Sequence, residues 1–156
     1  MKKIIILALG LGLFSTAATA QKVNVKSKAK TTKAIAAPSS VKNKFSSEYS
    51  AAKSVVWASS ANGNFIAKFN NPEGNNQMVE YTKSGEFVSG KTVYKIDATP
   101  EAVQKAIAKD YADYSVESVM KMNLPNLDPY YKVKVKANGG GLTKQLLVSE
   151  EGDISE

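Results

Sequence analysis

Apolar residues recur along the chain at two spacings, which predict two helices and a series of strands. Residues 38–52 and 100–111 each carry apolar residues three or four positions apart, the spacing of one helix face. These stripes are Val41, Phe45, Tyr49 and Ala52 in the first segment and Val103, Ala106, Ile107 and Tyr111 in the second. Thr99 is expected to cap the second helix, with Pro100 in its first turn. Both stripes are expected to face a core.

Segments of strand character follow each predicted helix. The predicted strands cover residues 55–57, 65–69, 77–81, 91–96, 116–122, 131–136 and 145–148. Asn62-Gly63 predicts a two-residue hairpin turn after the first strand. In the sixth strand, Tyr131, Val133 and Val135 alternate with lysines, so one sheet face is expected to pack on helices while the other meets water. A last strand near Asp153 is expected to be short or missing.

The chain also contains an internal repeat. Residues 38–49 align with residues 100–111, and residues 81–87 align with residues 148–154, each pair sharing its apolar positions or its glycine. We therefore predict one α+β domain over residues 38–156. It consists of two tandem helix-plus-antiparallel-strands units, at about 38–97 and 98–156, whose sheet has seven or eight strands.

The first 20 residues predict export. Lys2 and Lys3 precede an apolar run over residues 4–14, and Ala18-Thr19-Ala20 is a signal-peptidase pattern, so cleavage is expected between Ala20 and Gln21. The run is shorter than the roughly 20 apolar residues of a membrane anchor. The chain contains no cysteine, so neither a lipid attachment site nor disulfides are expected. The predicted location is periplasmic or secreted.

The net charge of +7 is concentrated before the predicted domain. Two of the 21 basic residues lie in the signal peptide and five in residues 21–37, which leaves 14 lysines against 14 acidic residues. Residues 21–37 therefore predict a basic flexible linker, for which weak contact with an anionic surface is an alternative role. Because arginine is absent and the domain is neutral, nucleic-acid binding is not expected.

Catalytic motifs are weak. Residues 85–92 match a phosphate-binding loop, but β-branched, alternating residues follow where that loop requires a helix. The pairs Ser39/Lys42, Ser50/Lys53 and Ser118/Lys121 match Ser-x-x-Lys without the partner motifs of acyl enzymes. Histidine and cysteine are absent, and the acidic residues around Gly152 do not have calcium-loop spacing. We expect no enzyme activity, cofactor or metal.

Surface recognition is the remaining expectation. Trp57 and Tyr131 are assigned to the core. The sheet face opposite the helices is expected to offer aromatic and lysine side chains for docking. The candidate protein-binding residues are Tyr94, Tyr130, Lys132 and Lys134.

The pattern as a whole resembles the PepSY-like, β-lactamase-inhibitor-like family of periplasmic proteins. The resemblance rests on the two x-P-x-x-V-x-x-x-[FI]-x-x-x-Y helices, Val55-Val-Trp57, Phe65-x-Ala67-x-Phe69 and the acidic residues after Gly85 and Gly152. It implies one curved antiparallel sheet with helices on one face. It also implies a non-enzymatic module that docks another envelope or secreted protein, with inhibition of a hydrolase as one role. A small-molecule or lipid carrier is the alternative.

Overall fold

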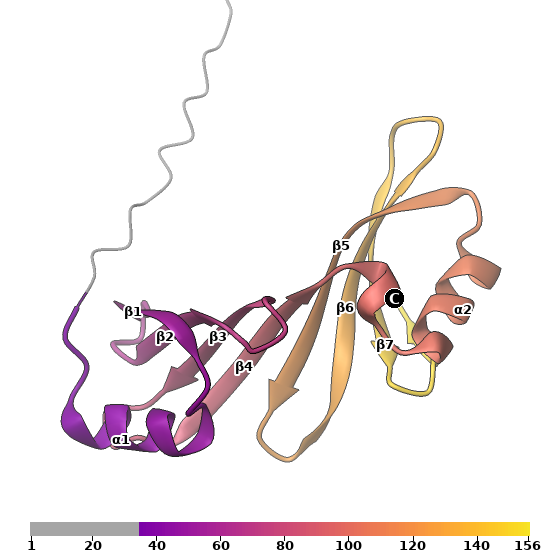
Figure 1. Cartoon of the computed structure of the whole chain (residues 1–156). Coiled ribbons are helices and arrows are strands. Elements are labelled where there is room, and N and C mark those ends of the chain that lie inside the picture. Colours follow the sequence, from indigo (N-terminus) through magenta and orange to yellow (C-terminus); the bar gives the residue numbers. More distant parts are fainter. Residues whose placement is uncertain (1–34) are drawn as a thin grey trace, which may run out of the picture. The chain divides into compact units, whose positions relative to one another are not determined.

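The computed structural model describes residues 35–156, which form an α+β domain with one curved, unclosed antiparallel sheet (Figure 1). Within that range there are two α-helices, a short 3₁₀ helix and eight strands, ordered β1 to β8 across the sheet. The elements are α1 (Ser39–Glu48), β1 (Lys53–Ser59), β2 (Phe65–Asn70), β3 (Asn76–Tyr81), β4 (Phe87–Tyr94), η1 (Ile96–Ala98), α2 (Glu101–Asp110), β5 (Tyr114–Leu124), β6 (Leu127–Ala137), β7 (Thr143–Ser149) and β8 (Ile154–Ser155). The predicted signal peptide and most of the predicted linker lie outside the described residues.

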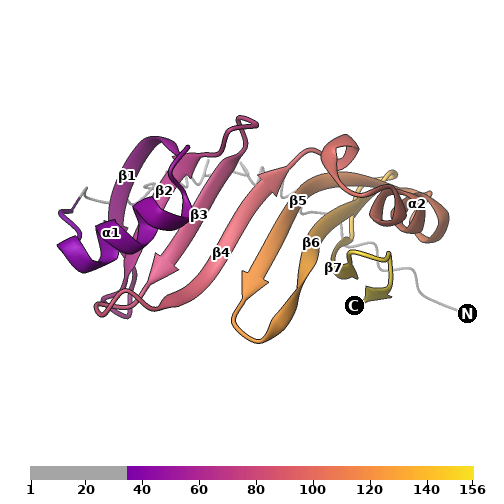
Figure 2. The ribbon, with the colours of Figure 1, turned by 60° about the horizontal axis from the view of Figure 1, so that its bottom comes forward.

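Each helix packs on the strands that follow it, so the predicted fold class is confirmed (Figure 2). In the first unit, Val41 and Phe45 of α1 join a cluster on β2 and β3. In the second, Val103 and Ile107 of α2 join a cluster on β5, β6 and β7. Tyr131 is 3% exposed, as predicted for a core residue.

The strand registers show that both helices cover the same sheet face. Val79 of β3 pairs with Gly90 of β4, which pairs with Asn123 of β5. Paired residues on neighbouring strands, and residues two apart on one strand, point to the same face of a sheet. The face that α1 covers on β3 is therefore also the face that α2 covers on β5. The opposite side, called the open face below, carries no helix among residues 35–156.

The start of α2 differs from the prediction. Pro100 rather than Thr99 precedes the first helical residue, and no side chain caps the helix. The Thr99 hydroxyl instead donates to the carbonyl of Ile96 at 2.6 Å, and the Gln104 amide donates to the Thr99 carbonyl at 2.7 Å. The Thr99 hydroxyl is therefore bonded within the preceding 3₁₀ turn and does not cap the helix.

The prediction of a two-residue turn at Asn62-Gly63 is wrong. Ser60 N–H donates to the Asn64 carbonyl at 3.0 Å, so three residues lie between the last paired positions. Gly63 has a φ of 77°, as expected for a type I turn followed by a glycine bulge. The Ser60 hydroxyl accepts a hydrogen bond from Asn64 N–H at 3.2 Å, which favours this longer turn. The same bonds recur in the hairpins of residues 71–75, 82–86 and 149–153.

Two other boundaries differ from the predicted ones, and the last strand follows one of the two predicted alternatives. Strands β5 and β6 extend to a tight hairpin in which Leu124 pairs with Leu127, so most of residues 123–130, which no predicted strand covers, is strand. The last strand is present and short, with Ile154 paired to Val148. The predicted linker ends before residue 37, because Ile35 N–H donates to the Trp57 carbonyl at 3.1 Å and Ala37 is buried.

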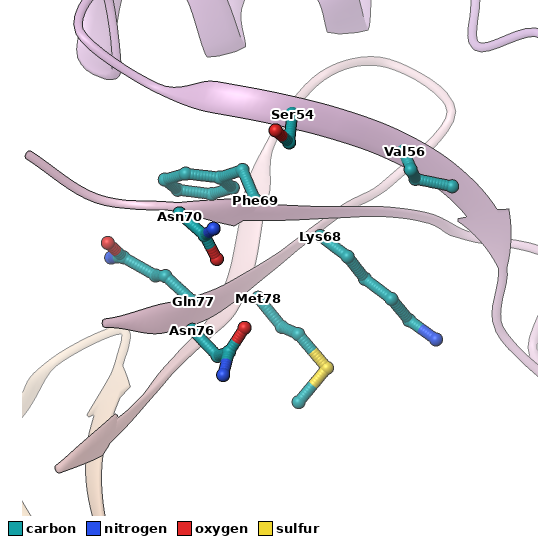
Figure 3. Close-up of a pocket in the computed structure, with 8 residues that line it drawn as sticks. All are labelled: Ser54, Val56, Lys68, Phe69, Asn70, Asn76, Gln77 and Met78. Carbon is teal, nitrogen blue, oxygen red and sulfur yellow. The ribbon is translucent and has the colours of Figure 1, made fainter. Parts of the chain in front are cut away.

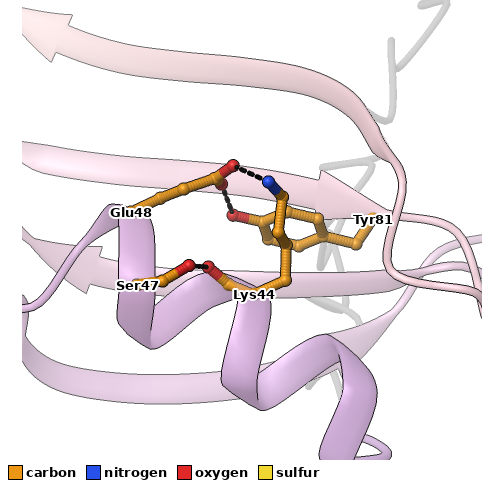
Figure 4. A network of polar contacts seen from close by, with 4 residues as sticks. All are labelled: Lys44, Ser47, Glu48 and Tyr81. Carbon is orange, nitrogen blue, oxygen red and sulfur yellow. Dashed lines mark hydrogen bonds and ion pairs between the residues drawn. The ribbon is translucent and has the colours of Figure 1, made fainter.

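A polar network joins α1 to β3 (Figure 4). The Tyr81 hydroxyl donates to Glu48 Oε2 at 2.7 Å, and Lys44 Nζ lies 2.9 Å from Glu48 Oε1. Burial opposes ionisation of Glu48, but the hydrogen bond from Tyr81 and the ion pair with Lys44 outweigh it and hold the pKa of the carboxyl below its usual value. Burial, followed by the bond to Glu48, raises the pKa of the Tyr81 hydroxyl. The network fixes the last turn of α1 on the sheet.

We expect Tyr81→Phe to lower the free energy of unfolding by about 1–2 kcal/mol at pH 7, because Glu48 loses a charge-assisted hydrogen bond. The lowered pKa of Glu48 adds stability above the carboxyl's unfolded pKa of about 4.3, and this contribution is lost as pH falls through the folded value. The difference between the variant and the wild type should therefore shrink below pH 4. Urea unfolding at pH 7 and pH 3 measures it, and a difference that is independent of pH would contradict the network.

Candidate functional site

A row of side chains runs across the open face from β1 to β6. Successive strand registers pair Val56 with Lys68, Lys68 with Met78, Met78 with Lys91, Lys91 with Met122, and Met122 with Tyr130. The cross-strand row is therefore Val56, Lys68, Met78, Lys91, Met122 and Tyr130. From Val56 to Met122, apolar side chains and lysines alternate along it.

A second row lies beside the first, on β4 to β7. It consists of Val93, Met120, Lys132 and Leu147, paired in that order. Val93 is 41% exposed, Leu147 is 36% exposed and Val56 of the first row is 49% exposed. Every methionine after Met1 lies in one of the two rows; Met78 and Met120 are half-buried, whereas Met122 is buried at 7% exposure. Methionine side chains adapt their shape to a partner, so this composition is typical of a protein-binding surface.

The rows contain three lysines and no carboxylate. Lys68, Lys91 and Lys132 are half-buried, so their aliphatic stems lie among the apolar side chains. In the part of the chain that the structure describes, five other lysines form ion pairs and none of these three does. On the same face, Glu80 accepts a hydrogen bond from Asn64, and Glu117 pairs with Lys134 at 2.6 Å. The rows therefore present unpaired positive charge.

Both ends of the rows are hollowed. A pocket of about 390 Å³ lies at the β1 end, lined by Val56, Lys68 and Met78 of the cross-strand row together with edge residues of β1 to β3. Figure 3 shows the Lys68 and Met78 side chains extending to the same side, away from Phe69. A second pocket of about 340 Å³ lies at the other end, where Tyr130 and Leu147 line it with β8.

The structure places three of the four predicted binding residues on the open face. Tyr130 ends the cross-strand row, Lys132 lies in the second row, and Lys134 is next to it along β6. Tyr94 lies on the opposite face, so its predicted placement is wrong. It pairs with Val119 and packs against the buried Tyr131 ring, with centroids 6.3 Å apart.

The error at Tyr94 has a physical cause. On β4 the buried residues are Gly90 and Thr92, of which Thr92 is 3% exposed, whereas its neighbour Val93 points to solvent. The large ring of Tyr94 covers the core cluster of the second unit from the same side as Thr92. Polarity alone therefore assigns the two faces of β4 incorrectly.

Sequence reasoning missed most of the two rows. Lys68, Met78 and Met120 lie in or beside predicted strands, and the alternation within each strand separates its two faces. It does not show which residues of different strands lie side by side. That information comes from the registers, which turn lengths and bulges set.

Residues 85–92 do not form a phosphate-binding loop, because Phe87–Tyr94 is strand β4 rather than a helix. Among residues 35–156, no group of histidine, cysteine, aspartate or glutamate side chains is arranged to hold a metal ion. In the same range, no helix has the length and apolar character needed to cross a membrane.

Comparisons with known proteins identify solved structures of the same fold. No protein-family model matches the chain, and no curated protein matches its sequence. A protein of Bacteroides eggerthii proposed to be periplasmic is 25% identical over 78% of this chain and 88% of its own, with a TM-score of 0.67. A DUF2874 family protein of Bacteroides ovatus is 22% identical over 78% and 86% of the two chains, with a TM-score of 0.69.

The name of a third solved structure is relevant to the predicted resemblance to β-lactamase-inhibitor-like proteins. A BLIP-like protein of Bacteroides fragilis is 19% identical over 78% of this chain and 85% of its own, with a TM-score of 0.70. At this identity the likeness concerns the fold. The chain therefore has a BLIP-like fold, where BLIP stands for β-lactamase inhibitor protein. This agrees with the β-lactamase-inhibitor-like part of the predicted family resemblance. The PepSY-like part of that resemblance stays a prediction.

Proposed function

We propose that this protein is a non-enzymatic binding module of the periplasm that docks another envelope protein on the open face of its sheet. One observation carries the proposal: the two rows place exposed Val56, Val93 and Leu147 and half-buried Met78 and Met120 on a sheet face that no described helix covers. Exposed apolar side chains gathered on one uncovered sheet face favour a partner-binding surface. The periplasmic description of one similar structure supports the location.

Inhibition of a hydrolase is the finer form of this proposal. It draws its support from the BLIP-like fold of a structural neighbour and from the predicted family resemblance. A fold hosts many functions, so the inhibitory role depends on the identity of the partner. The binding experiment below therefore precedes any inhibition assay.

A small-molecule or lipid carrier is the competing function. A carrier buries most of its ligand in a concave, largely enclosed site. The pocket at the β1 end is lined by strand residues, among them the polar side chains of Ser54, Asn70 and Asn76, and it lies on the sheet surface (Figure 3). Docking of a protein on the whole open face uses this hollow and the one at β8 together.

The test is a quantitative pull-down with the tagged chain from an envelope extract of its own cells. We expect the wild type to capture a protein whose affinity for the double variant Val93→Ala/Met120→Ala is about tenfold lower, because a central apolar contact is removed. Val93 and Met120 are cross-strand neighbours in the second row.

Leu142→Ala is the matched control. Leu142 is 74% exposed in the loop between β6 and β7, outside both rows, so its truncation should leave the affinity unchanged. Thermal unfolding of each variant separates lost binding from lost structure. Equal capture by the wild type and the double variant, with both folded, would contradict docking on the open face.

A further inference from the structure

We infer that the partner is an acidic protein surface whose carboxylates meet Lys68, Lys91 and Lys132 and whose apolar side chains fit between them. The inference rests on the proposed docking function and specifies the chemistry of the partner. The three lysines lie in the two rows and form no ion pair within residues 35–156. A carboxylate brought to such an unpaired ammonium group gains a charge-assisted hydrogen bond.

The lysines occupy alternate strands of the sheet. Lys68 lies on β2, Lys91 on β4 and Lys132 on β6, whereas the methionines of the rows lie on β3 and β5. Neighbouring strands are about 4.8 Å apart, so consecutive lysines lie on strands about 10 Å apart, with a methionine strand between them. Lys68 and Lys91 share a row, so a matching partner carries carboxylates about 10 Å apart with an apolar side chain between them, while Lys132 is offset by two residues along the strands. Residues i and i+7 of a helix have this separation, at about 1.5 Å per residue.

The alternation favours a protein over an anionic lipid surface. In a bilayer the phosphates and the acyl chains lie at different depths, so a lipid-binding face separates its basic residues from its apolar ones. Here Lys91 lies directly between Met78 and Met122 in one row, at one level of the sheet. Only a surface that interleaves carboxylates with apolar groups meets both at once. Such complementarity chiefly sets specificity and association rate.

A displayed library of random peptides, panned against the full-length chain, tests this inference. Peptides selected on the wild type should be enriched at least twofold in aspartate and glutamate over the unselected library. The triple variant Lys68→Glu/Lys91→Glu/Lys132→Glu should select lysine and arginine instead. Binding of a selected acidic peptide should weaken about tenfold between 0.05 and 0.5 M salt, because salt screens the ion pairs.

The matched control is Lys42→Glu/Lys95→Glu/Lys109→Glu, which changes the net charge equally at three exposed lysines outside the rows. This control should keep the acidic selection. The same acidic selection by the row variant would overturn the inference, because the rows would then not be the acid-binding site. Phosphatidylglycerol vesicles, tested by sedimentation, should bind the row variant and the charge-matched control equally.

The remaining outcomes separate this inference from the proposed function. Selected peptides that lack acidic residues but lose binding with Val93→Ala/Met120→Ala overturn the acidic partner and leave docking intact. Selected peptides whose binding is unchanged by every open-face variant overturn both the acidic partner and the proposed docking function. Vesicle binding that requires Lys68, Lys91 and Lys132, without acidic peptides, assigns the rows to a lipid surface and overturns the inference.

Discussion

Gly152→Ala is expected to lower the free energy of unfolding by about 3 kcal/mol, because the added methyl group meets both an unfavourable backbone conformation and a fixed neighbour. Gly152 has a φ of 95°, which side-chain-bearing residues rarely adopt. An added Cβ would lie 2.8 Å from the carbonyl oxygen of Ala102 in the first turn of α2. That oxygen belongs to helix backbone, so it does not move aside as a flexible side chain would. Either the turn between β7 and β8 or the helix must shift.

Gly74→Ala separates the two causes. Gly74 occupies the equivalent position of the turn between β2 and β3, with a φ of 84°, and an added Cβ there would meet nothing within 4 Å. Its substitution therefore carries only the conformational cost, about 1–2 kcal/mol. Urea unfolding of both variants compares the two values. If Gly152→Ala costs no more than Gly74→Ala, the turn does not pack against α2 as described.

The first unit brings its own turn glycine to a helix in the same way. An added Cβ at Gly85 would lie 3.6 Å from the carbonyl oxygen of Ser40 in α1, an ordinary contact. In the predicted repeat, Ser40 aligns with Ala102 and Gly85 with Gly152. In the sequence, both glycines are followed by an acidic residue. The sequence does not show that each turn lies against the start of a helix, because this contact depends on how the helix packs on the sheet.

Helix and strand types could be predicted because they follow from local periodicity. The stripe of Val103 and Ile107 and the alternation of Val133 and Val135 each lie within one element, and all four residues are buried as expected. The predicted turn at Asn62-Gly63 failed because a side chain, the Ser60 hydroxyl, selects a longer turn. Local polarity patterns do not encode such a bond.

The candidate site was less accessible to prediction than the fold. Tyr130 and Lys132 were found because β6 alternates without interruption. The residues beside them on β5 were not, because β5 carries two register irregularities, between Val116 and Ser118 and between Met122 and Leu124. Each irregularity changes which residues face each other across strands. A cross-strand row is therefore a property of the assembled sheet rather than of any one segment.

Leu146→Ala and Leu147→Ala form the second strong test, because these adjacent leucines of β7 point to opposite faces. Leu146 is fully buried in the core cluster of the second unit, whereas Leu147 is 36% exposed in the second row. Truncating Leu146 should lower the free energy of unfolding by about 3 kcal/mol, through lost burial and a residual cavity. Truncating Leu147 should cost under about 1 kcal/mol, since much less apolar surface is removed from contact.

The two leucines should respond in the opposite order when binding is measured. Leu147→Ala removes an apolar side chain from the second row, so it should weaken capture of the envelope partner, whereas folded Leu146→Ala should bind as the wild type does. Urea unfolding and quantitative pull-down on the same preparations measure both effects. A one-residue shift of β7 would exchange the faces of all its side chains. A large stability loss in Leu147→Ala with a small one in Leu146→Ala would therefore refute the register of β7 and, with it, the second row.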